Sequence, residues 1–155
     1  MPDGRTHGRI GAVAGSAAAF IATTELPNDG RFAATLAGLL AGYAGGKAPD
    51  ALEPAIHGWH RSECHSVAAG AAVTAAGVQA VIALKEDMLR QAAELRATRL
   101  TLPPNHPDQL SLWVREFGVY VAYGLIVGFT TGYASHLLLD GGTERGIPLI
   151  SKKLI

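Results

Sequence analysis

The sequence predicts an all-α fold, a compact bundle of about four main helices with a metal site formed by helix ends and a Pro/His-rich loop. Three observations support this prediction. Apolar residues recur at helical spacing in four segments, which turn-forming and Pro-rich stretches separate. The apolar content is mostly Ala and Gly, and aromatic residues make up 6% of the chain, so the helices are expected to approach closely through small residues. Histidines and carboxylates stand at the ends of these segments.

The first two helices are predicted from Gly8 to Thr24 and from Phe32 to Ala44. The run Pro27-Asn28-Asp29-Gly30 supplies a turn between them. Gly45-Gly46, followed by Pro49, is expected to end the second helix, because glycine favours the left-handed C-cap and the residue before a proline avoids helical angles.

The stretch from Ala48 to Arg61 is dense in Pro, His, Asp and Glu and is predicted to be a loop. Loops held by rigid helices often carry binding chemistry. A long third helix is predicted from Cys64 to Thr98. It is Ala-rich at first and charged from Lys85 onward, so its second half is expected to project into solvent or against a partner.

The fourth helix is predicted from Gln109 to Leu139, after a Pro-rich break at 102–107. Asp108 is placed to cap its first turn. The tail from Asp140 to Ile155 contains two consecutive glycines and Pro148 and is predicted to be irregular.

Length and composition limit the classes of protein. A chain of 155 residues suits a single domain, 1–155. The formal net charge of zero and the lack of a long Lys/Arg run argue against nucleic acid as a stable partner. The single cysteine, Cys64, cannot form an intramolecular disulfide, and the apolar stretch after Arg9 has no convincing cleavage site. The chain is therefore predicted to be cytoplasmic or inner-membrane associated and not secreted; whether it forms a homo-oligomer stays open.

Two apolar segments, Ser66 to Leu84 and Gly118 to Leu139, are long enough to cross a hydrocarbon core of about 30 Å. Their many Ala and Gly residues contribute little transfer energy, and ionisable groups lie within or beside them. The sequence leaves both a soluble bundle and a membrane-associated protein open, and it favours the soluble bundle slightly.

Two groups of residues carry metal-binding chemistry. His136 and Asp140 are one helical turn apart, so both side chains can reach one cation. A core histidine bonded to a nearby carboxylate is the alternative. A second cluster puts three imidazoles, those of His57, His60 and His65, within nine residues where a loop enters a helix. Imidazole together with carboxylate suits zinc or another first-row divalent ion, whereas the alternative here is a polar loop with helix-capping residues.

Asp50 and Glu53 place two carboxylates close in sequence to the histidine cluster. A carboxylate can bridge two metal ions or act as a general base. Asp50 could instead be a simple N-cap of a short turn. His7 precedes the first predicted helix, and spacing alone does not single it out.

Four motifs follow one another along nearly the whole chain. They are Thr6-His7 with Gly11, then Gly45-Gly46-Lys47-Ala48-Pro49-Asp50-Ala51-Leu52-Glu53-Pro54, then His60-Arg61-x-x-x-His65-Ser66, and Gly132-Tyr133-x-Ser135-His136-Leu-Leu-Leu-Asp140 with Thr143, Gly146 and Pro148. With these motifs the chain resembles the bacterial and phage family of membrane-bound, metal-dependent hydrolases, the inner-membrane proteins associated with the SOS response. The second, third and fourth motifs agree with that family in order, spacing and residue type.

The resemblance implies that one metal centre, with one or two Zn²⁺ ions or other first-row divalent ions, gathers His7, Asp50, His60, His65, His136 and Asp140. Glu53 is implied as a further ligand or base, while His57 and His106 match no family position. The His/Asp pattern is also similar to that of helical zinc phospholipases and zinc nucleases, which hydrolyse phosphoesters. Glu63-Cys64 stands where the family often has an aromatic or small residue, which leaves the identity of the metal open.

The predicted function is metal-dependent hydrolysis, with phosphoesters as the candidate substrates. The ion would lower the pKa of a bound water, Asp50 or Glu53 would accept its proton, and Arg61 would stabilise an anionic substrate, either a small molecule or a lipid. The alternative is a structural or interaction protein, a membrane or virion component, in which the metal holds the helices together without catalysis.

Overall fold

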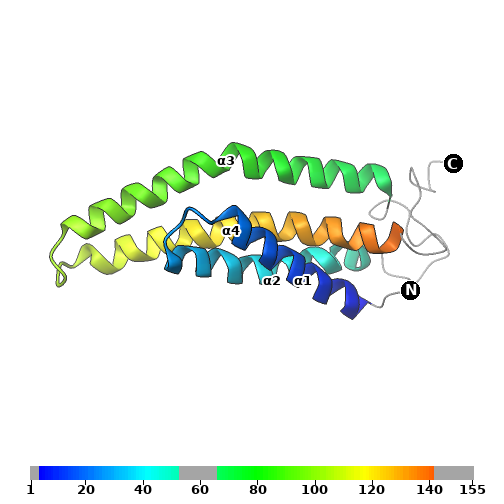
Figure 1. Cartoon of the computed structure of the whole chain (residues 1–155), viewed down its shortest axis with the longest axis horizontal. Helices are drawn as coiled ribbons and strands as arrows, with labels where there is room; N and C mark the ends of the chain where they lie inside the picture. The colour runs from blue at the N-terminus through cyan, green and yellow to red at the C-terminus, as the bar shows by residue number, and fades with distance from the viewer. Residues whose placement is uncertain (1–3, 53–65, 142–155) are drawn as a thin grey trace.

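The computed structural model describes residues 4–52 and 66–141, and every regular element within these ranges is an α-helix. The helices are α1 (Gly4–Ala22), α2 (Asn28–Leu52), α3 (Val67–Thr101) and α4 (Asp108–Gly141). They form the predicted four-helix bundle (Figure 1). The beginnings of α1 and α3 and the ends of α2 and α4 lie together at what we call the α1 end; the turn between α3 and α4 forms the opposite, hairpin end (Figure 1).

The second helix is longer than predicted. α2 runs through Gly45, Gly46 and Pro49 to Leu52, so the prediction that it ends at Ala44 is wrong. The loop predicted from Ala48 to Arg61 is also wrong for residues 48–52, which are helical. Both glycines pack inside the bundle instead of capping the helix: a Cβ on Gly46 would lie 3.2 Å from Cα of Gly11 in α1. Proline lacks one amide hydrogen bond, a loss that the packing of α2 against its neighbours outweighs.

The other boundaries differ less from the prediction. α1 begins at Gly4 rather than Gly8, and α3 covers Val67–Thr101. Asp140 and Gly141 are the last residues of α4 rather than the start of an irregular tail. Residues 53–65 and 142–155, with the rest of the predicted loop and tail, lie outside the described ranges.

The backbones of α1, α2 and α4 are in direct contact at glycine. A Cβ on Gly15 of α1 would lie 2.8 Å from Cα of Gly42 in α2, and a Cβ on Gly132 of α4 would lie 2.8 Å from the same atom. Real Cβ atoms essentially never lie this close to another heavy atom. Gly42 is thus held between two helices at distances that only glycine allows, as expected for helices that associate through small residues.

Most large apolar side chains of α1 and α2 point outward, whereas the interior between these helices is filled mostly by Ala and Gly. Ala19, Ala34 and Ala37 are buried, but Val13 is 71% and Leu40 62% exposed. In water such a surface would be unfavourable, whereas in a bilayer it faces hydrocarbon. Within the described residues α4 is the helix long and apolar enough to cross a membrane, and only 28% of its most apolar window is buried, unlike the core helix of a soluble protein.

The charged half of α3 and the first turns of α4 extend past α1 and α2 as a helical hairpin (Figure 1). The carboxylate of Glu116, which is 1% exposed, accepts hydrogen bonds from Arg96 at 2.9 Å, Arg99 at 3.1 Å and the Tyr120 hydroxyl at 3.0 Å. Arg96 also donates to Asp29 of α2 at 3.2 Å. This buried network ties α3 to α4 and to the beginning of α2.

Replacing Gly42 with Ala should destabilise the bundle by roughly 1–3 kcal/mol or more, since the added methyl group must push two helix backbones apart. Gly118→Ala is the matched control, because a Cβ at Gly118 meets nothing within 4 Å. This substitution should leave stability unchanged or raise it by up to about 1 kcal/mol through helix propensity. Thermal unfolding in detergent, followed by circular dichroism, measures both, and equal effects of the two substitutions would contradict the close contact.

Removing the buried carboxylate with Glu116→Ala should cost roughly 1–3 kcal/mol, because the Tyr120 hydroxyl and Arg99 lose this acceptor and Arg96 keeps only Asp29. Glu94→Gln is the control, since Glu94 and its partner Arg90 form an exposed pair on α3. Exposed pairs contribute little, so the control should unfold like the wild type. A Glu116 variant as stable as the control would show that the network does not hold the hairpin to the bundle.

Candidate metal centre

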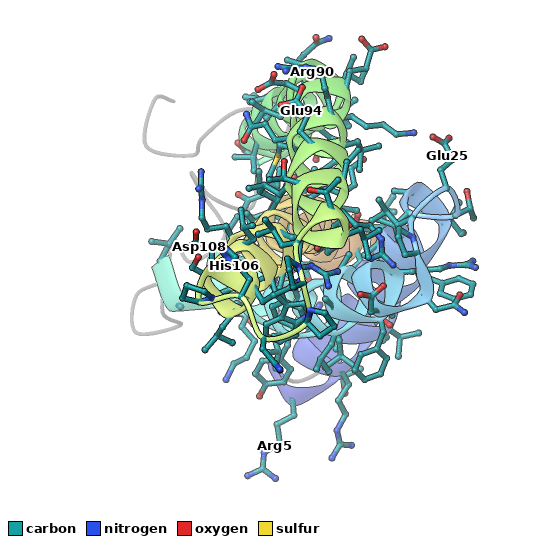
Figure 2. The ribbon with its side chains drawn as sticks, turned by 90° about the vertical axis from the view of Figure 1, so that its left-hand side faces the viewer. Arg5, Glu25, Arg90, Glu94, His106 and Asp108 are labelled. Atoms are coloured by element: carbon teal, nitrogen blue, oxygen red, sulfur yellow. The ribbon has the colours of Figure 1, made fainter. Side chains whose placement is uncertain are left out.

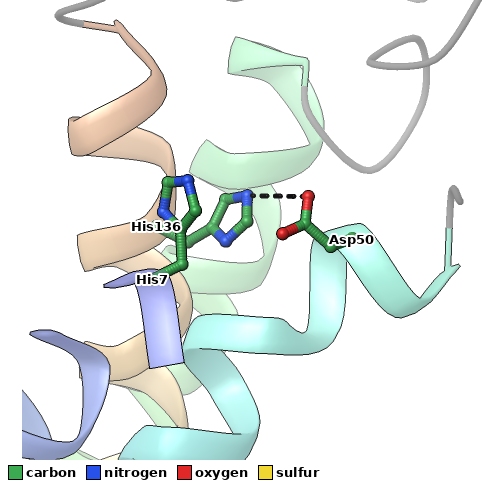
Figure 3. Close-up of side chains that lie close together, drawn as sticks. All are labelled: His7, Asp50 and His136. Atoms are coloured by element: carbon green, nitrogen blue, oxygen red, sulfur yellow. Dashed lines mark ion pairs between the residues drawn. The ribbon is translucent and has the colours of Figure 1, made fainter. Parts of the chain in front are cut away.

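Four of the predicted ligands come together at the α1 end. His7 comes from α1, Asp50 from α2, and His136 and Asp140 from α4. One donor atom from each of His7, Asp50 and His136 lies within 4.8 Å of the other two (Figure 3). His7, His136 and Asp140 are at most 1% exposed, whereas the Asp50 side chain is 33% exposed. Three side chains of the cluster are therefore buried, and solvent reaches the fourth, Asp50.

Helix packing places the two histidines. His7 stands in the first turns of α1, and its carbonyl carbon would lie 3.2 Å from a Cβ on Gly46, so α1 can reach this position only because residue 46 is glycine. His136 lies one turn after Gly132, the residue through which α4 contacts Gly42. The same glycine contacts that join the three helices thus set the distance between the imidazoles.

The carboxylate of Asp140 bridges the Nε2 atoms of the two imidazoles. Its Oδ1 is 3.4 Å from Nε2 of His7, and its Oδ2 is 3.5 Å from Nε2 of His136. The rings are stacked, with centroids 4.0 Å apart and an angle of 26° between their planes. On the other side, Oδ1 of Asp50 is 3.7 Å from Nε2 of His136 (Figure 3). Both Nε2 atoms therefore face carboxylate oxygens.

The backbone carbonyl of Gly46 determines that Nδ1 is a protonated nitrogen of His136. Nδ1 of His136 is 2.7 Å from this oxygen, and because a carbonyl can only accept, Nδ1 must carry the proton. In the imidazolium form Nε2 carries an N–H toward Asp50 and Asp140, whereas in the neutral ring its lone pair can accept a hydrogen bond or bind a cation. A histidine that donates one ring N–H to a backbone carbonyl while its other nitrogen faces carboxylates is the common arrangement of metal ligands.

The donor set fits a first-row divalent ion. Two imidazoles and two carboxylates suit zinc better than calcium or magnesium, which prefer oxygen ligands throughout. Ligand atoms around tetrahedral zinc lie about 3.4 Å apart, given bonds of about 2.0–2.1 Å. The donor atoms of His7, Asp50 and His136, at up to 4.8 Å, would need only small side-chain rotations to reach that spacing.

The remaining predicted site residues, Glu53, His60, Arg61 and His65, lie outside the described ranges, as do His57 and Cys64. His106, which the sequence leaves out of the site, lies at the hairpin end, where its Nδ1 accepts a hydrogen bond from the amide of Asp108 at 3.2 Å (Figure 2). The sequence did not identify the Gly46 carbonyl as a partner of His136. The signal for this contact was Gly46 itself, a small residue in the same motif as Asp50, because a glycine there lets another helix approach the backbone.

A comparison with models of known protein families identifies the family of this chain. The model of the YdjM inner membrane protein family matches residues 1–151, and the chain belongs to this family. Inner-membrane association is therefore confirmed, and the slight preference for a soluble bundle is wrong. The curated proteins contain no match. The solved structures contain none either.

Proposed function

We propose that this member of the YdjM inner membrane protein family is a metal-dependent hydrolase with one or two zinc ions, or other first-row divalent ions, at the α1 end. The observation that carries the proposal is the convergence of His7, Asp50 and His136, from three different helices, within 4.8 Å of one another. Asp140 completes this described part of the site. The resemblance of the motifs adds His60 and His65 as further ligands.

The bound ion would supply Lewis-acid chemistry and lower the pKa of water at the site. The buried side chains of His7, His136 and Asp140 hold and orient the ligand set. Asp50 is the described member that solvent reaches, so its carboxylate is the group placed to accept a proton from water. Glu53 is the second candidate for this role, and Arg61 would bind an anionic substrate oxygen. Phosphoesters of small anions or lipids are the proposed substrates.

A structural role for the same ion is the second candidate, supported by the composition of the core. The buried hydrophobic residues are mostly alanines, and the ligands come from three helices, so an ion would join helices with little side-chain bulk between them. The 33% exposure of Asp50 favours catalysis, because a structural site is closed whereas a catalytic site keeps a position for water.

Metal content tests the site itself. The full chain, purified in detergent without chelators or a metal-affinity column, should hold about one or two equivalents of zinc by plasma mass spectrometry. His136→Ala and Asp140→Asn should lose most of it, since each removes a ligand or the carboxylate that orients both imidazoles. His106→Ala is the matched control and should keep the wild-type content. Wild-type protein that takes up no metal when zinc is supplied would remove both the catalytic and the structural proposal.

Turnover separates catalysis from a structural role. Asp50→Asn should lower hydrolysis of bis(p-nitrophenyl) phosphate by about 100-fold, the size of a general-base contribution. Its melting temperature should change little, because three described ligands stay in place. The exposed Glu86→Gln on α3 serves as the control for loss of a carboxylate. The structural role would be favoured by two results together. The wild type would show no turnover on a panel of phosphoesters, and Asp50→Asn would have both a lower metal content and a lower melting temperature.

A further inference from the structure

Three cations at the α1 end have no acidic partner in the described part of the chain. Arg5 and Arg9 on α1 and Lys47 on α2 are all exposed, and no described carboxylate forms an ion pair with them. Toward the hairpin end, Lys85, Arg90, Arg96 and Arg99 each pair with a carboxylate, and Arg115 is the exception among the described cations there. Three of the five described cations without an ion pair thus lie around the beginning of α1, and the other two, Arg31 and Arg115, lie apart from them.

The three cations share one side of the bundle. Arg5 and Arg9 are one turn apart and so lie on the same face of α1. The stem of Lys47 lies against that turn, because a Cβ on Gly8 would be 3.1 Å from its Cγ. Arg5 points away from the other helices (Figure 2). We call Arg5, Arg9 and Lys47 the cationic rim.

An apolar surface begins directly beside the cationic rim. Ile10 and Val13 on α1 are 37% and 71% exposed, and Leu40 and Tyr43 on α2 are 62% and 42% exposed. Nζ of Lys47 lies 5.4 Å from the centre of the Tyr43 ring. A tyrosine next to a lysine, with aliphatic residues beyond them, is the pattern of a chain that passes from hydrocarbon into headgroups.

The length of this apolar surface fits a bilayer. Along α2 it is bounded by Lys47 and by Arg31, whose guanidinium lies over the Phe20 ring at 3.5 Å. The helix between these two cations rises about 24 Å. Long cationic side chains reach a few ångströms further, so the charges can sit at both surfaces of a hydrocarbon core of about 30 Å.

We propose that the cationic rim binds the phosphates of anionic phospholipids in the leaflet at the α1 end. Positive side chains at the boundary of an apolar surface attract anionic headgroups, whereas a soluble anion would gain nothing from the apolar residues beside them. This inference rests on the surface of α1 and α2 and holds whether or not the neighbouring site is catalytic. It places His7, in the same turns of α1 as Arg5 and Arg9, at the level of the headgroups.

The test measures lipid preference of the full chain. Native mass spectrometry of the protein in detergent, with equal amounts of phosphatidylglycerol and phosphatidylcholine, should show that the wild type retains the anionic lipid preferentially. At about 1 kcal/mol per cation, each of Arg5→Gln, Arg9→Gln and Lys47→Gln should lower this preference by about fivefold. Arg115→Gln, an exposed arginine of the hairpin with no ion pair in the described residues, should leave it unchanged.

Further variants and competitors decide the outcome. The charge-preserving Arg9→Lys should retain the preference, and the triple glutamine variant should keep the wild-type metal content. A triple variant that still prefers phosphatidylglycerol would overturn the proposal. So would inorganic phosphate that displaces the lipid at equal concentration, since the site would then be one for soluble anions. If the triple variant loses its helical circular dichroism, the three single variants decide between these outcomes.

Discussion

The contact of α2 with the backbones of both α1 and α4 is the constraint on which the rest of the structure depends. Gly42 lies between these helices, and Gly46, one turn later, lies against the carbonyl of His7. One turn after Gly132 on α4, Nδ1 of His136 donates to the Gly46 carbonyl. A larger residue in α2 would thus separate the helices and, with them, the two imidazoles. Packing and site geometry are consequences of the same close approach.

The small interior also explains which environment the chain occupies. Because backbone fills the centre of the bundle, the bulky side chains of Val13, Leu40 and others are left on the surface, where lipid solvates them. The sequence favoured a soluble bundle because Ala and Gly contribute little transfer energy. On α2, Ala34 and Ala37 are buried whereas Phe32 and Leu40 are exposed, so residue counts understate the apolar surface that this helix presents to the membrane.

The spacing of His136 and Asp140 predicted their proximity, since one helix fixes both. Spacing could not predict that His7 and Asp50 would join them, because those distances depend on contacts between helices; only the family resemblance did. The end of α2 was predicted wrongly for a related reason. Glycine followed by proline usually ends a helix, but at Gly46 tertiary packing uses the missing side chain and keeps the helix intact.

The two buried polar clusters of the bundle differ in how their charges are balanced. At the hairpin end Glu116 accepts from two arginines and a tyrosine, so permanent cations neutralise it. At the α1 end Asp140 is equally buried, yet its described cationic neighbours are the imidazoles of His7 and His136. Neutral imidazole brings no positive charge, and two stacked imidazolium rings would repel each other. The described charge balance of Asp140 therefore depends on the protonation of imidazole, whereas that of Glu116 does not, because guanidinium groups stay charged.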